Sequence, residues 1–161
     1  MRIGVLGCTH DKLANVAKIV ELFNAAAVER VVHTGDITGA TTLEVLSLLE
    51  APLWGVYGNN DVEREALAAA ADRFGFHLAD PPLRLVWAER ALSVVHDPFD
   101  ISETLRKESA VVLHGHNHRR VIQRQNGRLI FNPGECAGTF EGRNSVGVLD
   151  LESLATELLL F

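Results

Sequence analysis

The first half of the chain alternates buried strands with amphipathic helices. Strand-like apolar segments and segments with helical spacing follow one another three times, the strands at residues 2–7, 30–36 and 53–61 and the helices at residues 9–27, 41–51 and 62–75. Chains that alternate in this way form a parallel sheet, because each helix crosses over the sheet and returns the next strand in the same direction. The pattern therefore predicts an α/β fold.

The second half is richer in strands. Further strand-like segments lie at residues 83–96, 110–116, 119–134 and 145–161. Asn126 and Gly127 predict a hairpin turn, since both residue types accept positive φ angles. No linker, repeat or low-complexity stretch interrupts the sequence. We expect one α/β domain over residues 1–161, in which two mixed sheets lie face to face with helices outside.

Composition narrows the classes of function. The 161 residues are 47% hydrophobic and 22% charged, as in an ordinary globular protein, and the formal net charge is −6. Stable nucleic-acid binding through clustered Lys and Arg is not expected of such a chain, although bound cations would let it hold a small phosphate ester. Cys8 and Cys136 are too few for a disulfide framework, and Cys136 is expected to be a packing residue. With no signal sequence or membrane span in view, we expect a cytoplasmic protein with no membrane partner.

Side chains of the types that bind metals recur where the predicted strands end. They are Cys8, His10, Asp36, Asn59, His96, His116 and His118. Each alone has an ordinary explanation as a turn, cap or core residue. As a set they are more informative, because ligands of open α/β sheets gather beyond the carboxyl ends of the strands. His116 and His118, on extended backbone, are expected to reach neighbouring metals.

The ordered motifs resemble the signature series of the calcineurin-like metallophosphoesterases. The matching segments are Cys8-Thr9-His10, Gly35-Asp36, Gly58-Asn59-Asn60-Asp61, the strand-end His96 and Gly115-His116-Asn117-His118. The segments HTGD, YGNND and NPGECAG are further similar to the small single-domain bacterial and archaeal phosphodiesterases of that family. The resemblance runs nearly from end to end. It implies a four-layer αββα sandwich and a centre of two divalent metal ions.

The resemblance also implies a role for each side chain. One ion would be held by Cys8, His10, Asp36 and His118, and the other by Asp36, Asn59, His96 and His116, with Asp36 bridging the two. The implied catalytic residues are Asp36, Asn59, His10 and His116. The implied enzyme is a dinuclear metal-dependent phosphodiesterase that uses Mn, Fe or Zn and attacks the ester with a metal-bridging hydroxide.

The expected partner is a small phosphodiester or nucleotide substrate, and a homo-oligomer is compatible with the sequence. Two alternatives stay open for the function. One is a phosphomonoesterase, and the other is a catalytically weakened scaffold or binding protein of the same fold.

Three positions depart from the family pattern. The family places Asp where this chain has Cys8; a thiolate keeps the negative charge but favours zinc or iron, and the alternative is a small buried packing residue. Asn60 stands where many larger relatives have a histidine that protonates the leaving group, and an amide cannot act as that acid. Asp97 follows His96 where relatives usually have glycine, so an acidic contact or a narrower pocket is expected there.

Other polar residues have structural interpretations. Asp11 is predicted to cap a helix, and the pair Asn60 and Glu63 fits a capping box, with contact to phosphate as the alternative for Asn60. Asp61 is predicted to be an acid at a helix start, with orientation of Asn59 or Asn60 as the alternative. His33 is expected in the core or behind the ligands rather than among them.

Overall fold

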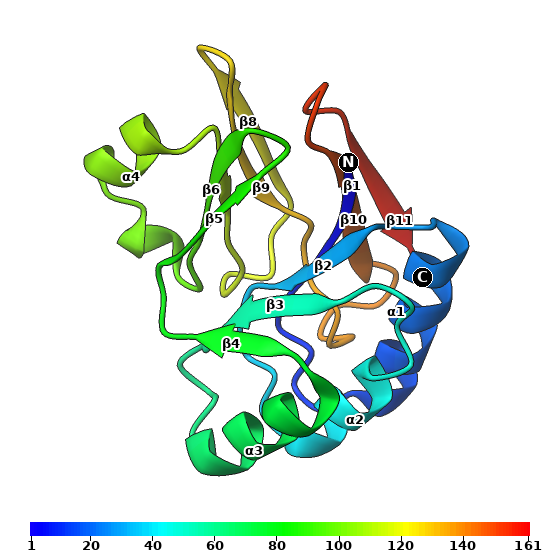
Figure 1. Ribbon diagram of the computed structural model, residues 1–161. Coiled ribbons are helices and arrows are strands. Elements are labelled where there is room, and N and C mark those ends of the chain that lie inside the picture. Colours follow the sequence, from blue (N-terminus) through cyan, green and yellow to red (C-terminus); the bar gives the residue numbers. More distant parts are fainter.

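Two β-sheets lie face to face in the computed structural model, which describes residues 1–161 (Figure 1). The strand orders are β11-β10-β1-β2-β3-β4 in the first sheet and β5-β6-β7-β9-β8 in the second. The strands of the first sheet are β1 (Arg2–Leu6), β2 (Arg30–His33), β3 (Leu53–Val56), β4 (His77–Ala79), β10 (Ser145–Asp150) and β11 (Thr156–Leu160). Those of the second are β5 (Leu83–Trp87), β6 (Arg90–Val94), β7 (Val111–Leu113), β8 (Val121–Gln125) and β9 (Arg128–Asn132).

Helices lie outside both sheets. The first sheet is accompanied by α1 (Leu13–Ala25), α2 (Ala40–Leu46) and α3 (Arg64–Phe74), and the second by the short 3-10 helix η1 (Pro98–Asp100) and α4 (Glu103–Glu108). None of these helices has the length and apolar character needed to cross a membrane.

Three hydrophobic cores fill the spaces between these layers. The largest joins α1, α2 and α3 to the first sheet and includes Phe23 of α1 and Leu53 of β3. The second lies between the sheets and includes Val5 of β1 and Phe131 of β9. The smallest lies beneath α4 and includes Leu105. Strands buried on both faces read as continuous apolar runs, which is how they appear in the sequence.

The strand directions determine where the functional loops lie. Strands β1, β2, β3 and β4 are parallel to one another, and so are β6, β7 and β9 in the second sheet. Loops that leave the carboxyl ends of β1, β2 and β3 therefore emerge at one edge of the first sheet. The loops after β6 and β7 meet them there, as the contacts described below show.

The predicted α/β class and the four-layer sandwich are confirmed. The predicted hairpin turn is also present, with φ angles of 52° at Asn126 and 72° at Gly127 between β8 and β9. Three elements, β4, η1 and α4, were not predicted. Helix α4 buries only Leu105, so its sequence has no apolar periodicity, and its start is marked instead by Ser102, whose hydroxyl accepts a hydrogen bond from the Leu105 N–H (3.1 Å).

The predicted helix caps are wrong, because their side chains have partners elsewhere. Helix α1 has no side-chain cap, and Asp11 instead accepts a hydrogen bond from the Thr42 hydroxyl (2.6 Å). Helix α3 starts after Glu63, also without a side-chain cap. The amide of Asn60 points away from α3 and donates to Asp36 (2.9 Å).

Candidate metal centre

The loops at the carboxyl edge bring together all seven side chains that the sequence analysis selected. Cys8 and His10 follow β1, Asp36 follows β2, Asn59 follows β3, His96 follows β6, and His116 and His118 follow β7. Their polar atoms form two overlapping groups. Ligand atoms of Cys8, His10 and His118 lie within 4.8 Å of one another, and so do those of Cys8, Asp36 and His96.

Asp36 connects the two groups. Its carboxylate is 2% exposed, and its Oδ2 atom lies 3.6 Å from His10 Nε2 and 3.4 Å from His96 Nε2. The same His96 Nε2 atom lies 2.9 Å from Asn59 Oδ1 and 3.1 Å from His116 Nδ1. A carboxylate between two sets of nitrogen and oxygen atoms is the arrangement in which one side chain can serve two cations.

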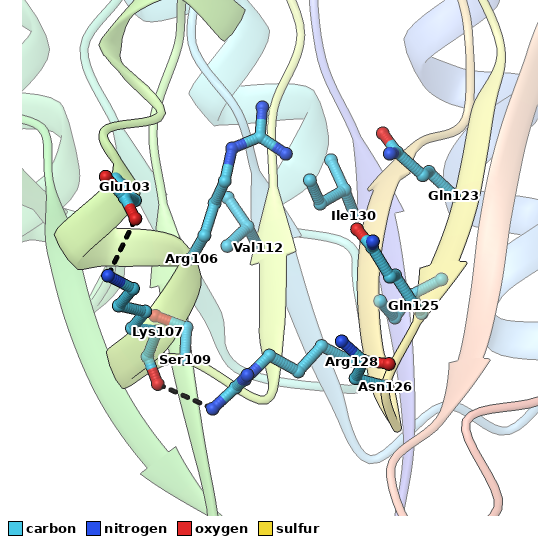
Figure 2. Close-up of a pocket in the computed structure, with 11 residues that line it drawn as sticks. Glu103, Arg106, Lys107, Ser109, Val112, Gln123, Gln125, Asn126, Arg128 and Ile130 are labelled. Atoms are coloured by element: carbon cyan, nitrogen blue, oxygen red, sulfur yellow. Dashed lines mark hydrogen bonds and ion pairs between the residues drawn. The ribbon is translucent and has the colours of Figure 1, made fainter.

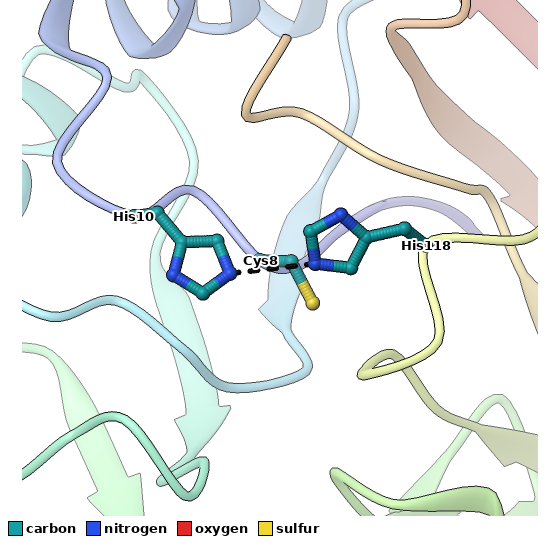
Figure 3. Close-up of side chains that lie close together, drawn as sticks. All are labelled: Cys8, His10 and His118. Atoms are coloured by element: carbon teal, nitrogen blue, oxygen red, sulfur yellow. Dashed lines mark hydrogen bonds between the residues drawn. The ribbon is translucent and has the colours of Figure 1, made fainter. Parts of the chain in front are cut away.

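The other group centres on two imidazoles that face each other. His10 Nε2 and His118 Nε2 are 3.4 Å apart, and the side chain of Cys8 lies close to both rings (Figure 3). Two facing imidazole nitrogens need either a proton or a metal cation between them, since two lone pairs would repel each other.

Hydrogen bonds at the far side of two rings set their tautomers. His96 Nδ1 lies 2.8 Å from the carbonyl oxygen of Thr34, and His118 Nδ1 lies 3.0 Å from Oε2 of Glu135. These oxygens accept hydrogen bonds, so the Nδ1 atoms carry the protons and, in the neutral rings, the Nε2 lone pairs face the centre. Histidines that bind metals are held in this way.

The backbone at the centre is unusual. Positive φ angles occur at five of the seven residues, namely Cys8 (56°), His10 (45°), Asp36 (58°), His116 (67°) and His118 (55°). The prediction of extended backbone at His116 and His118 is therefore wrong. Left-handed conformations of non-glycine residues cost energy and cluster at functional sites.

The chemistry of the donors fits two divalent transition-metal ions. The set offers one thiol, one carboxylate, one amide oxygen and four imidazoles, which are ligand types that zinc, iron and manganese accept. Lone pairs on His96, His118 and Asn59 converge with the Asp36 carboxylate, and bound cations would satisfy them together.

Comparison with known proteins identifies the family. Residues 1–154 match the calcineurin-like phosphoesterase superfamily domain. The chain belongs to this superfamily. The phosphoesterase is 33% identical over 156 residues to phosphodiesterase MJ0936 of Methanocaldococcus jannaschii, and the match covers 94% of each chain.

Solved structures agree with this assignment. The phosphoesterase matches the structure of a novel archaeal phosphodiesterase with a TM-score of 0.92 and 31% identity over 100% of both chains. The fold is also that of YfcE, a phosphoesterase from E. coli, with a TM-score of 0.74 and 19% identity over 99% of this chain and 98% of that one. The family and the hydrolase class predicted from the sequence are thereby confirmed.

Burial and hydrogen bonding have opposite effects on the pKa values of two acidic side chains of the phosphoesterase, Asp36 and Cys8. Burial would raise the pKa of Asp36, but hydrogen bonds with His96 and from Asn60 outweigh it and hold that pKa well below its usual range. Burial raises the pKa of the Cys8 thiol to about 12, against the hydrogen bond that its sulfur accepts from the His116 N–H (3.2 Å). A thiol of this kind becomes a thiolate when a cation binds it.

Asp61 and Asn60 hold Asp36 in place, a role that the sequence analysis missed. Asp61 is 3% exposed, and its carboxylate accepts hydrogen bonds from the backbone N–H groups of Asp36 (3.0 Å), Thr38 (2.7 Å) and Gly58 (2.6 Å). It is therefore not a helix-start acid. The backbone N–H of Asn60 donates to Asp36 Oδ1, and its side-chain amide to Oδ2, each at 2.9 Å.

Glu135 and Asn132 support the histidines after β7 and were also missed. Glu135 is 1% exposed and is shared between His118 Nδ1 (3.0 Å) and the backbone N–H of Phe140 (2.7 Å). The amide of Asn132 donates to the Gly115 carbonyl (3.1 Å) and so fixes the start of the loop. Glu135 lies in the segment NPGECAG, and the similarity of this segment to the family was the one sequence feature that could have pointed to its role.

Two expectations about buried residues agree with the structure. His33 is fully buried and its Nε2 lies 3.1 Å from the Thr9 hydroxyl, so it packs behind the ligands. Cys136 is fully buried in the core beneath α1, α2 and α3, and both cysteines are free.

A pocket of about 430 Å³ opens beside the metal-ligand cluster. Asn59, His96 and His116 line its inner side, and Asp97 stands at its wall. Asp97 Oδ2 lies 3.7 Å from His116 Nε2, and Oδ1 accepts a hydrogen bond from the Phe99 N–H (2.9 Å). The expected acidic contact is thus present, and the turn of η1 fixes its direction.

Proposed function

We propose that this phosphoesterase is a dinuclear metal-dependent phosphodiesterase. One ion would be held by Cys8, His10, Asp36 and His118, and the other by Asp36, Asn59, His96 and His116. The observation that carries the proposal is the position of Asp36 Oδ2 between His10 Nε2 (3.6 Å) and His96 Nε2 (3.4 Å). The relative MJ0936, named a phosphodiesterase, supports the diester class.

Divalent ions, when bound, lower the pKa of a water and offset charge on the phosphoryl oxygens. The side chains of the protein position the reacting groups. Asn60 and Asp61 hold Asp36, while the Thr34 carbonyl and Glu135 hold the rings of His96 and His118. An ester in the adjoining pocket would meet His116, whose Nε2 is directed toward Asp97 at the pocket wall and is placed to donate to a phosphoryl oxygen.

Aryl phosphodiesters are expected to be cleaved about 100-fold faster than alkyl phosphodiesters, because no side chain protonates the leaving group. The amide of Asn60 already donates to Asp36 and has no proton to transfer at neutral pH. The measurement compares kcat/KM for thymidine 5′-(4-nitrophenyl) phosphate and for a thymidine dinucleotide, with protein loaded with Mn, Fe or Zn. Asn60→His is the matched variant and should raise the alkyl rate selectively.

The same assay tests the proposal itself. Turnover of the aryl diester with at least one of the three metals supports it. If none of the metals gives turnover, the phosphodiesterase proposal is rejected in favour of a scaffold or binding protein. A higher kcat/KM on 4-nitrophenyl phosphate than on the diester would indicate a monoesterase. Equal rates on aryl and alkyl diesters would contradict the assignment of Asn60.

Asp97→Asn is expected to raise the monoesterase-to-diesterase ratio by roughly threefold to tenfold, because a phosphate monoester carries one more negative charge than a diester. The Asp97 carboxylate is 3.7 Å from His116 Nε2, at the wall where the phosphoryl group would lie. The monoesterase-to-diesterase ratio is measured as kcat/KM for 4-nitrophenyl phosphate divided by kcat/KM for bis(4-nitrophenyl) phosphate. Asp100→Asn, at the outer lining of the same pocket, is the control, and an equal change there would rule out a specific role for Asp97.

A further inference from the structure

A groove on the outer face of the second sheet takes no part in the proposed function. The first sheet is covered by α1, α2 and α3, but only η1 and the short α4 lie over the second, so β8 and β9 are partly uncovered (Figure 1). A groove of about 360 Å³ lies between α4 and the β8–β9 hairpin (Figure 2). This volume is within the range of small-molecule sites.

The groove is distant from the metal-ligand cluster. Leu129, one of the residues that line it, pairs with Val111 at the start of β7, whereas His116 and His118 follow the other end of that strand. None of the metal-ligand candidates lines the groove. An occupant of the groove would therefore bind independently of the two ions.

The floor is apolar and the walls are polar. Val112 is buried at the bottom, and the partly buried Ile130 packs against the same small core beneath α4. Such a floor suits a flat ring, since it removes apolar area from water without presenting unpaired polar atoms.

The charge of the walls is positive although the protein as a whole carries −6. Three cationic side chains, Arg106, Lys107 and Arg128, line the groove with a single carboxylate, Glu103. That carboxylate is engaged by Lys107 at 2.6 Å, and the Arg128 guanidinium is oriented by donating to the Lys107 carbonyl at 2.8 Å. Arg106 extends into the groove with no partner among the lining residues (Figure 2). Unpaired guanidinium groups favour phosphate, which they can bind with two parallel hydrogen bonds.

The opposite wall offers amides. Gln123 and Gln125 are two residues apart on β8, so they share the face that lines the groove across from Arg106 (Figure 2). Arg124, between them, is directed to the other face and donates to the Leu154 carbonyl at 2.8 Å. A carboxamide both donates and accepts, which is the pattern needed to pair with the edge of a nucleobase.

We propose that this groove is a binding site for a nucleoside monophosphate. The phosphate lies against Arg106 and Arg128, and the base lies over Ile130. Gln123 and Gln125 contact the polar edge of the base. The cations suit the phosphate, while the apolar floor and the paired amides suit the face and the polar edge of the base.

The test is a titration of the zinc-loaded protein, followed by NMR of the backbone amides, with the non-hydrolysable phosphonate analogue of AMP. Saturable shifts are expected in residues 103–109 and 123–130. The double variant Arg106→Gln, Arg128→Gln should lower the affinity about tenfold or more, because both charged contacts to the phosphate are lost. Arg124→Gln, the same type of substitution at an arginine directed to the opposite face of β8, should leave it unchanged.

Three results would overturn the proposal. One is the absence of saturable shifts in those residues, including shifts confined to the loops of the metal-ligand cluster. A second is an equal loss of affinity in Arg124→Gln. The third is inorganic phosphate binding as tightly as the analogue, which would show that the base is not recognised. Failure of the phosphodiesterase assay affects none of these outcomes.

Discussion

Replacing Asp36 with Asn should lower kcat/KM on an aryl phosphodiester by roughly 1,000-fold or more, because the change removes the one carboxylate that two cations would share. Asp36 Oδ2 lies between His10 Nε2 at 3.6 Å and His96 Nε2 at 3.4 Å, and no other carboxylate belongs to either group of candidate ligands. The amide keeps the size of the side chain but supplies no negative charge. Metal content, measured by mass spectrometry after gel filtration, should fall from two ions per chain to one or fewer.

The control for this experiment is Asp72→Asn, an exposed acid on α3 with the same chemical change. It should keep both ions and full activity, and circular dichroism should show that both variants are folded. If Asp36→Asn retained two ions and more than about a tenth of the activity, the bridging role of Asp36 would be rejected.

The order of the layers was predictable because it depends on local apolar patterns. The segment at residues 13–23 alternates apolar and polar residues with helical spacing, and it forms α1. Two residues, Asn126 and Gly127, were enough to predict the hairpin formed by β8 and β9. In contrast, α4 was missed because a six-residue helix that buries one leucine leaves no periodic signal.

The convergence of the seven candidate ligands was predictable for a different reason, since parallel strands place their carboxyl ends at one edge. The residues that support the ligands were not. Asp61 accepts hydrogen bonds from Asp36, 25 residues away, and Glu135 meets His118 across 17 residues. The residues next to Asp61 in the sequence suggest that it belongs to the helix that follows it. They carry no information about the distant backbone N–H groups that donate to its carboxylate. For the same reason Asn60 was read as a cap when it contacts Asp36.

Replacing Cys8 with Ala should lower metal occupancy and reduce activity by about 100-fold or more, since Cys8 belongs to both groups of candidate ligands. Cys8→Asp, which introduces the residue typical of the family, should keep two ions but shift the preference from zinc or iron toward manganese or magnesium. The carboxylate can accept the His116 N–H that the sulfur now accepts at 3.2 Å. Metal analysis after equilibration with an equimolar mixture of these ions measures the preference.

Cys136→Ala provides the matched control, because it removes a second fully buried thiol that packs in the core and belongs to neither group of candidate ligands. If Cys8 acts only through packing, the two alanine variants should lose comparable stability and neither should change its metals. Ligation predicts a different pattern, in which Cys8→Ala alone loses metal and Cys8→Asp recovers it with altered selectivity. If metal occupancy and metal preference were unchanged in both Cys8 variants, Cys8 would be a packing residue only. One ion would then be held by His10, Asp36 and His118 alone.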